Sequence, residues 1–369
     1  MEKGAGVTEE HFMARAIALA ASVPFTSPNP KVGAVVVRDG EVLAEGRHLG
    51  AGHPHAEAAA IEGVDARGAT LYVNLEPCCH VGRTPPCTEL LIDAGVARVV
   101  VGCEDPDPRV SGNGVRRLRE AGVEVVEGVM EQEARDLNLP FFTRLREGRS
   151  FVTLKLALTL DGRLAAADGS SRWITGPESR RHAHSLRRSA DAVLVGAATV
   201  LSDDPLLTVR HVETSRQPVR IIADARGVVP PGSRLLASAD VAPVIIATTA
   251  RCPHDTAIAY KEAGAEVLLL PEDEGGIDLG ALLRELAARG MNEVLCEGGA
   301  RLATALVRRR LADRLELHYA PVATGGGPVI GDLGIPSMDH AMRFRTRSIV
   351  QRGADWNVTL LAADSQEAR

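Results

Sequence analysis

Apolar positions along the chain follow two alternating patterns. Short runs of Val, Ile and Leu recur between longer segments in which apolar residues lie three or four positions apart. The short runs are typical of buried strands and the longer segments of amphipathic helices. In the first part of the chain this predicts strands at 32–37, 41–45, 70–75, 98–102 and 123–126, and helices at 8–22, from 55 onward, and at 87–94, 115–121 and 131–146. The alternation predicts an α/β sheet covered by helices on both faces.

The pattern restarts after the polar stretch 147–150, and we place a domain boundary there. A chain of 369 residues is too long for one ordinary core, so we expect two domains, 1–148 and 149–369. The second domain also reads as α/β. Its strands are predicted at 151–158, 192–195, 219–223, 244–247, 266–270, 293–296 and 315–319, with 356–361 as a closing edge strand.

Composition limits the possible partners. The net charge is -6 and only 3% of residues are aromatic, so the chain has neither a basic stripe nor a stacking platform for nucleic acid. No apolar run is long enough to span a membrane, and the first residues lack the apolar core of a secretory signal. We therefore expect a cytoplasmic protein that acts on a small molecule and binds neither nucleic acid nor membrane. We also expect a homo-oligomer, which the composition itself does not indicate.

A candidate metal motif begins before the third predicted strand and continues after it. His55 and Glu57 are followed by Cys78, which comes after Pro77, and by Cys87. A zinc ion with three protein ligands and one open position lowers the pKa of its bound water to about 7. Zinc deaminases combine such a site with a His-x-Glu glutamate as acid and base, followed by Pro-Cys-x-x-Cys. Here the second Cys comes nine positions after the first instead of three.

One feature of this motif leaves a second interpretation open. Cys79 or His80 could supply a fourth ligand and close the site as a structural zinc knot. On a regular helix, His55 and Glu57 would also point about 200° apart, so we expect them at an irregular first turn. The presence of Glu57 favours the catalytic interpretation, and Cys79 is expected to be a neighbour of the metal.

The motif resembles one known family. His-Ala-Glu at 55–57, Glu-Pro-Cys at 76–78 and Gly-Arg-Thr-Pro-Pro-Cys at 82–87 are similar to the deaminase half of the bifunctional riboflavin-biosynthesis deaminase/reductases, which carry this longer Cys-to-Cys spacing. The resemblance implies a cytidine-deaminase-like three-layer αβα domain with zinc bound by His55, Cys78 and Cys87 and with Glu57 as proton shuttle. It also implies substrate contacts from Asn29, His48 and Arg83.

The second domain carries weaker signals of its own. Its first strand is not followed by the Gly-x-Gly-x-x-Gly of a Rossmann dinucleotide site. The segment 297–300 precedes a helix predicted at 302–310, whose first N–H groups could bind an anion. Lys155 lies in an apolar strand, so it either reaches a cleft or faces outward at a sheet edge. Isolated histidines are interpreted as surface or packing residues: His182, His184 and His211.

The family resemblance extends over this half as well. Leu154-Lys155, 161–163, 171–175, 198–200, 203–205 and 297–299 recur in order and resemble the reductase half, which is similar in fold to dihydrofolate reductase and uses NADPH. The resemblance implies a phosphoribosyl-pyrimidine site at Ser171, Arg187, Leu207, Arg210 and Glu297, and we add Lys155. It implies an NADPH site at Ala157, Trp173, Thr199, Asp203, Ala225, Gly299, Ala300, Arg301, Leu302, Ala303, Thr304 and Ala305.

These features together predict a two-step enzyme. The first domain is expected to remove the 2-amino group of 2,5-diamino-6-(ribosylamino)pyrimidin-4-one 5'-phosphate with zinc, and the second to reduce the ribosyl chain to ribityl with NADPH. One alternative is a deaminase of nucleic-acid or free bases with an appended nucleotide-binding domain. Another is a non-enzymatic zinc module joined to a nucleotide sensor.

Overall fold

The computed structural model describes residues 8–80, 85–274 and 276–363. The chain divides into two compact units, Met1–Glu147 and Gly148–Arg369. Arg83, one of the expected substrate contacts, lies outside the described residues. Among the described helices, none combines the length and apolar character needed to cross a membrane.

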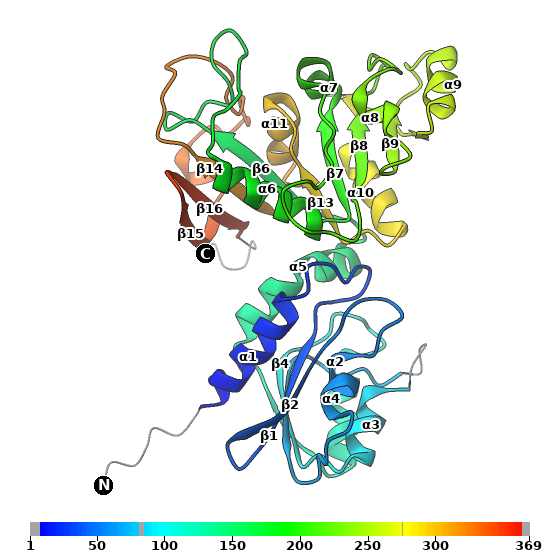
Figure 1. The fold of residues 1–369 in the computed structure, drawn as a ribbon, viewed down its shortest axis with the longest axis vertical. Coiled ribbons are helices and arrows are strands. Elements are labelled where there is room, and N and C mark those ends of the chain that lie inside the picture. Colours follow the sequence, from blue (N-terminus) through cyan, green and yellow to red (C-terminus); the bar gives the residue numbers. More distant parts are fainter. Residues whose placement is uncertain (1–7, 81–84, 275, 364–369) are drawn as a thin grey trace. The chain divides into compact units, whose positions relative to one another are not determined.

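The first unit is built on a five-stranded sheet (Figure 1). Its strands are β1 (Gly33–Arg38), β2 (Glu41–Arg47), β3 (Thr70–Leu75), β4 (Arg98–Cys103) and β5 (Glu124–Glu127), and its helices are α1 (Glu9–Ala21), α2 (Ala56–Ile61), α3 (Cys87–Asp93), α4 (Asn113–Glu120) and α5 (Glu131–Glu147). The strand order is β2-β1-β3-β4-β5. β1 runs antiparallel to both neighbours, whereas β3, β4 and β5 are parallel.

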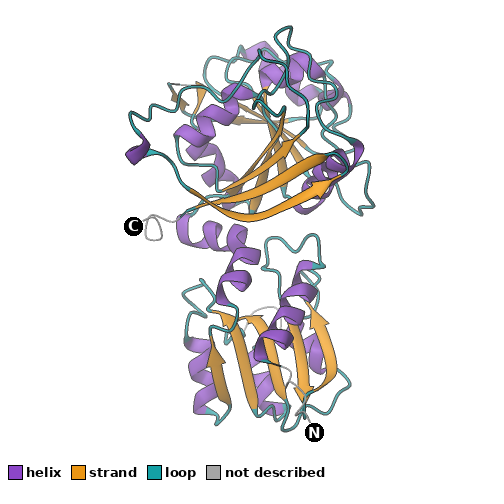
Figure 2. Ribbon diagram, turned by 90° about the vertical axis from the view of Figure 1, so that its left-hand side faces the viewer, coloured by secondary structure: helices purple, strands orange, loops and turns teal. Residues whose placement is uncertain are grey.

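Helices cover both faces of this sheet. α1 and α5 contact each other and pack on one face, while α2, α3 and α4 form a row on the other (Figures 1 and 2). Alternate residues of β1 serve the two layers, because Val35 packs with Phe12 of α1 and Val36 packs with Ala56 of α2. The carboxyl end of β3 and the first turns of α2 and α3 thereby come together. The predicted three-layer arrangement is confirmed.

Gly46 sets the distance between β2 and α2. A Cβ atom added at Gly46 would lie 2.1 Å from the carbonyl oxygen of Ala56 and 2.4 Å from the nitrogen of Ala60. Real Cβ atoms do not approach backbone this closely, so any side chain at this position has to push the helix away. The absence of a side chain at residue 46 therefore helps to place the first turn of α2, which carries Glu57.

We expect Gly46→Ala to destabilise the first unit by about 1–3 kcal/mol, the usual cost of overpacking, and to slow any reaction that depends on α2. Urea unfolding followed by circular dichroism measures the first effect. The matched control is Gly232→Ala, where an added Cβ meets no atom within 4 Å. Equal stability of the two variants would show that α2 can shift freely.

The second unit contains a nine-stranded sheet. Its strands are β6 (Phe151–Leu158), β7 (Ala192–Gly196), β8 (Val219–Ala223), β9 (Val244–Thr248), β10 (Glu266–Leu269), β13 (Glu293–Cys296), β14 (Arg314–Tyr319), β15 (Phe344–Arg352) and β16 (Asp355–Ala362). The order is β10-β9-β8-β7-β13-β6-β14-β16-β15, and a small separate ribbon is formed by β11 (Glu272–Asp273) and β12 (Gly276–Ile277). The strands are parallel from β10 to β14 and antiparallel from β14 to β15.

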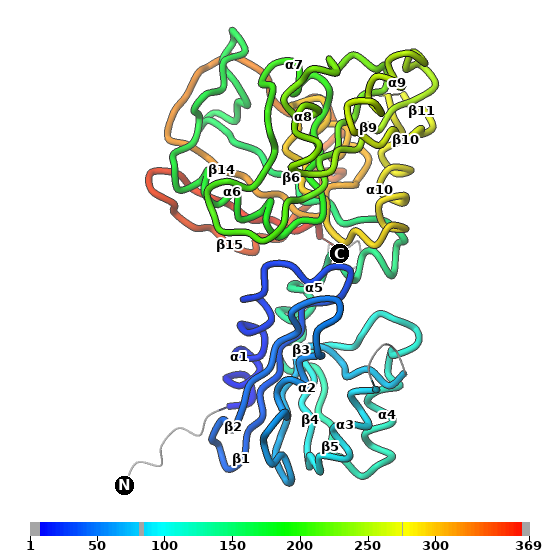
Figure 3. Tube along the Cα trace, turned by 45° about the vertical axis from the view of Figure 1, so that its right-hand side comes forward, coloured from blue at the N-terminus to red at the C-terminus, as the bar shows by residue number. Residues whose placement is uncertain are grey.

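Helices again pack on both faces of this sheet. The helices are α6 (Pro177–Ser189), α7 (Ala197–Asp203), α8 (Arg234–Ala237), α9 (His254–Glu262), α10 (Leu279–Ala288) and α11 (Ala300–Arg308), with a 3₁₀ turn η1 at Met338–His340. The core formed with α10 and α11 holds Leu154 and Leu194, and the core formed with α7, α8 and α9 holds Val193 and Ile222. Figure 3 shows α9 beside β9 and β10.

Two predictions for this unit are corrected by the sheet order. The stretch 356–361 was expected as an edge strand, but β16 lies between β14 and β15. The edge strand at this end of the sheet, β15, went unrecognised because most of its residues are polar, which leaves little apolar pattern. β6 lies in the interior between β13 and β14, so the interpretation of Lys155 as an edge-facing residue is wrong.

Candidate active sites

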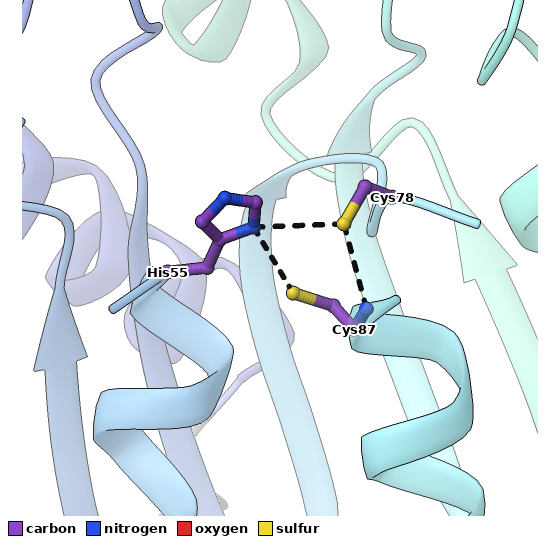
Figure 4. Close-up of side chains that lie close together, drawn as sticks. All are labelled: His55, Cys78 and Cys87. Carbon is purple, nitrogen blue, oxygen red and sulfur yellow. Dashed lines mark hydrogen bonds between the residues drawn. The ribbon is translucent and has the colours of Figure 1, made fainter. Parts of the chain in front are cut away.

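His55, Cys78 and Cys87 meet at one end of the first sheet (Figure 4). Nδ1 of His55 lies 3.2 Å from Sγ of Cys87 and 3.5 Å from Sγ of Cys78. Zinc bonds of about 2.1 Å to nitrogen and 2.3 Å to sulfur place tetrahedral ligand atoms about 3.6 Å apart. The three side chains therefore fit a zinc ion with small adjustments.

Each of the three ligand candidates comes from a different element. His55 has extended backbone and is the N-cap of α2, Cys78 follows β3, and Cys87 is the first residue of α3. The backbone N–H of Cys87 donates to Sγ of Cys78 at 3.4 Å. Donation from the Cys87 thiol, followed by that from His55, lowers the pKa of Cys78, although burial opposes this. One sulfur is thereby prepared as a thiolate, the form that binds metal.

The neighbouring residues of the Cys-Cys-His stretch do not join this group. Sγ of Cys79 faces the carbonyl oxygen of Arg109 at 3.5 Å. In the part of the chain that the structure describes, the cluster contains His55, Cys78 and Cys87, and neither Cys79 nor His80 belongs to it. This geometry leaves the fourth position open and does not favour the structural zinc knot.

Glu57 lies in the first turn of α2 and is buried, with an exposed fraction of 3%. Burial raises the pKa of its carboxyl to about 7, and the Cys78 sulfur acts in the same direction. The positive charge of a zinc ion would oppose this shift. A carboxyl group that can gain and lose a proton near neutral pH is suited to general acid–base catalysis.

Asn29 and His48 lie beside the trio. Nδ2 of Asn29 is 2.9 Å from Nε2 of His48, and Nδ1 of His48 is 2.8 Å from the carbonyl oxygen of Pro54. These contacts are satisfied when His48 donates from Nδ1 and accepts at Nε2, which is the neutral form. Burial lowers the pKa of His48 and favours that form. The His48 ring lies edge-on to His55, with centroids 5.4 Å apart.

Glu76 is a residue of the motif whose role the sequence did not reveal. Its buried carboxylate accepts backbone N–H groups of Gly112 at 3.0 Å, Val115 at 3.1 Å and Asp105 at 3.3 Å. These bonds tie the end of β3 to the start of α4. Glu76 therefore fixes the backbone two residues before Cys78, and the only signal for it in the sequence was its place in Glu-Pro-Cys.

A second group of polar side chains lies in the other unit. Glu297, which follows β13, forms a two-pronged ion pair with Arg187 of α6, and the Nη2–Oε2 distance is 3.0 Å. Both side chains are 11% exposed. Burial raises the pKa of Glu297, but Arg187 and then Lys155 outweigh it and hold the pKa at about 2. Lys155 lies on β6, and burial lowers its pKa.

The other expected substrate contacts fall into two groups. Arg210 lies near Arg187: each donates to Thr208, at 3.2 Å and 3.0 Å, and the charge of Arg187 helps burial to lower the pKa of Arg210. Ser171 is half-buried in the loop before α6. Leu207 is 3% exposed and packs in the core, so only its main chain is available to a ligand.

The expected NADPH contacts lie near the carboxyl ends of the parallel strands. Ala157 is on β6, Thr199 and Asp203 are on α7 after β7, and Ala225 follows β8. Gly299 is the N-cap of α11 after β13 and lies next to Thr199. Ligands of open α/β sheets bind at this end of the strands, and phosphates bind at helix N-termini. These residues fit a dinucleotide.

Individual members of this set differ in exposure. Trp173 is 72% exposed, with the guanidinium of Arg180 4.6 Å from its ring centre. Arg172 connects the loop of Trp173 to α7 by donating to the carbonyl of Asp203 at 2.8 Å. The remaining candidates lie in the first turns of α11, where Ala303 is buried in the core and two neighbours pack against it: Ala300, Arg301, Leu302 (packed), Ala303 (buried), Thr304 and Ala305 (packed).

Comparison with known proteins defines the class. Residues 7–103 match the cytidine and deoxycytidylate deaminase zinc-binding region, and residues 150–358 match the RibD C-terminal domain. The chain thus joins a zinc-binding deaminase domain to a reductase-type domain.

Full-length relatives carry both parts. The chain is 46% identical to riboflavin biosynthesis protein RibD of Aquifex aeolicus (94% of this chain, 96% of the relative) and 41% identical to that of Escherichia coli (96% and 100%). RibD of Acinetobacter baumannii has a TM-score of 0.84 at 36% identity, covering 96% of this chain and 99% of that one. A deaminase/reductase of Thermotoga maritima has a TM-score of 0.82 at 39% identity, covering 96% and 98%.

The chain belongs to the RibD family of riboflavin biosynthesis proteins. The predicted family and the two predicted domain folds are confirmed. A nucleic-acid deaminase with an appended domain and a non-enzymatic zinc module are both disfavoured, since relatives match over the whole length.

Proposed function

We propose that the two units catalyse consecutive steps on one phosphorylated pyrimidine. The first step is hydrolysis of the 2-amino group of 2,5-diamino-6-(ribosylamino)pyrimidin-4-one 5'-phosphate, which releases ammonia. The second is reduction of the ribosyl chain to ribityl with NADPH. The observation that carries this proposal is the His55–Cys78–Cys87 cluster beside buried Glu57, in a chain whose full-length relatives are RibD proteins.

In the first step we assign the chain's residues separate tasks. His55, Cys78 and Cys87 hold zinc, which when bound makes hydroxide available at neutral pH. Glu57 takes one proton from the attacking water and delivers it to the ring nitrogen, and it then carries the remaining proton of the new hydroxyl group to the departing amine. As the C–N bond breaks, ammonia leaves and a carbonyl oxygen remains on the ring. Asn29 and His48, which contact each other at 2.9 Å, orient the pyrimidine.

In the second step the protein mainly positions its reactants. Lys155, Arg187 and Arg210 supply positive charge for the phosphorylated sugar, with Ser171, the main chain of Leu207 and the carboxylate of Glu297 beside them. The first turn of α11 and the ends of β6, β7 and β8 hold NADPH, which supplies the hydride. Correct placement of cofactor and open-chain sugar accounts for much of the rate enhancement.

Zinc removal separates the two steps. We expect a chelator-treated protein to lose ammonia release from the diaminopyrimidine phosphate, and added Zn²⁺ to restore it. With the deaminated intermediate as substrate, NADPH oxidation, followed by its absorbance, is expected to continue, because none of His55, Cys78 and Cys87 belongs to the proposed reductase site. Ammonia release from the metal-free protein at the original rate would contradict the proposed first step.

We further propose that the chain works in the cytoplasm as a homo-oligomer. Cys78 and Cys87 have to stay reduced to hold zinc, which suits a reducing compartment. β15 is an edge strand with Ile349 65% exposed and Val350 39% exposed, and exposed apolar side chains on an edge strand are suited to contact with a second copy. Sedimentation of the purified protein tests the oligomeric state.

A further inference from the structure

A second group of metal-binding side chains is buried in the other unit, beneath α6. His182 comes from α6, and Glu316 and His318 come from neighbouring positions on the same face of β14. One ligand atom from each residue lies within 4.8 Å of the others. The exposed fraction is 20% for the His182 side chain, 6% for that of Glu316 and 0% for His318 as a whole. Nothing in the proposed reaction uses this group.

His318 has unmet hydrogen-bonding capacity. Among the described residues, neither of its ring nitrogens has a hydrogen-bond partner, although the residue is fully buried. Leaving a buried polar atom unpaired is destabilising, so such atoms normally contact a ligand, an ion or water. Burial and the nearby charge of Lys155 lower the pKa of His318, so the ring is neutral, as a metal ligand has to be.

Glu316 is already oriented toward the histidines. The hydroxyl of Thr359 on β16 donates to Oε2 of Glu316 at 3.0 Å, a type of supporting contact that commonly fixes metal-binding carboxylates. Oε2 lies 3.9 Å from Nε2 of His182. Two atoms bound to one ion at about 2.1 Å can be at most about 4.2 Å apart. This pair could therefore bind one ion with only small rotations.

We propose that His182, Glu316 and His318 form a second metal site, which takes a divalent transition ion such as Zn²⁺. The site would offer two imidazole nitrogens and one carboxylate oxygen. Such a donor set favours transition ions over Mg²⁺ and Ca²⁺, which prefer oxygen ligands alone. Lys155 pairs in register with Glu316 from β6, and its positive charge opposes a cation. Glu297 lies close enough to raise the pKa of Lys155 and so offsets part of that charge.

The ion would join α6 to the sheet. His182 lies five positions before Arg187 on the same helix, and Arg187 pairs with Glu297 at the proposed reductase site. Fixing His182 to β14 therefore restricts movement of the helix that carries Arg187. The site has a positioning role and is separate from the deaminase trio in the other unit.

Metal content of the full chain tests this proposal. Purified protein is dialysed against Zn²⁺, freed of unbound ion and analysed for zinc per chain. We expect His182→Gln and Glu316→Gln each to lose one equivalent relative to the unchanged chain, while ammonia release stays the same. The test compares zinc per chain in each variant with zinc per chain in the unchanged protein. Zinc retained by the deaminase trio contributes equally to both values and cancels. His182 is only half-buried, so its substitution is the variant less disruptive to folding.

The control and a second readout separate this site from incidental binding. His254→Gln removes a histidine whose side chain is 86% exposed and is expected to leave the zinc content unchanged. Co²⁺ gives thiolate charge-transfer absorption at the His55–Cys78–Cys87 trio but only ligand-field bands at a site of nitrogen and oxygen. Those ligand-field bands should weaken in His182→Gln while the charge-transfer band remains. Equal zinc content in the unchanged chain, His182→Gln and Glu316→Gln would overturn the proposal.

Discussion

Replacing Glu57 with Gln is expected to slow ammonia release by about 10²–10⁴-fold, the usual contribution of a general acid–base residue. Gln has nearly the same shape but cannot take a proton from water or return it to the leaving amine. The carboxyl is buried in the first turn of α2, two residues after His55, so bulk solvent has little access to replace it. Ammonia release from the diaminopyrimidine phosphate measures the loss.

Three comparisons make the result specific to Glu57. Zinc content should be unchanged in Glu57→Gln, because the residue is not a ligand in this proposal. NADPH oxidation with the deaminated intermediate should also be unchanged. Glu62→Gln, at the exposed end of the same helix, should retain full activity. Ammonia release by Glu57→Gln within a few fold of the original rate would mean that another group carries the proton.

The zinc-ligand candidates of the first unit could be predicted because a short sequence motif contains all three of them. His55, Cys78 and Cys87 are residue types that bind zinc, and their spacing matches a known family. The sequence also predicted a helix from His55 onward, and the structure places that residue as the N-cap of α2, which begins at Ala56. Local signals were sufficient here, since each ligand lies at the end of a strand or the start of a helix.

The arrangement of the second unit depended on contacts that no local pattern contains. From the sequence, the Lys155 side chain was equally compatible with reaching a cleft and with facing outward at a sheet edge. Only the strand order shows that β6 is internal. Most residues of β15 are polar, so apolar periodicity did not reveal it. His182 and His318 are separated by more than a hundred residues, and their approach depends on α6 packing over β14. The sequence-based interpretations of Lys155 as an edge residue and of His182 as an isolated histidine relied on sequence neighbours alone.

The Arg187–Glu297 pair links stability to the proposed reductase site. Glu297→Gln should destabilise the second unit by about 3–5 kcal/mol, because it leaves the guanidinium of Arg187 buried without its counter-charge. It should also slow NADPH oxidation. Urea unfolding followed by tryptophan fluorescence reports on this unit alone, because the two tryptophans of the chain, Trp173 and Trp356, both lie in it. Ammonia release should be unaffected.

An exposed ion pair of the same unit provides the control. Glu272→Gln removes the partner of Arg251, whose side chain is half exposed, and should cost less than about 1 kcal/mol. The pH dependence supplies a second check. The folded pKa of Glu297 is about 2 against an ordinary value of 4.5, so its stabilisation is fully present above pH 4.5 and is lost as the pH falls toward 2. The stability difference between the original chain and Glu297→Gln should therefore shrink through that range, and a difference that stayed constant would show that the buried carboxylate is not the source of the effect.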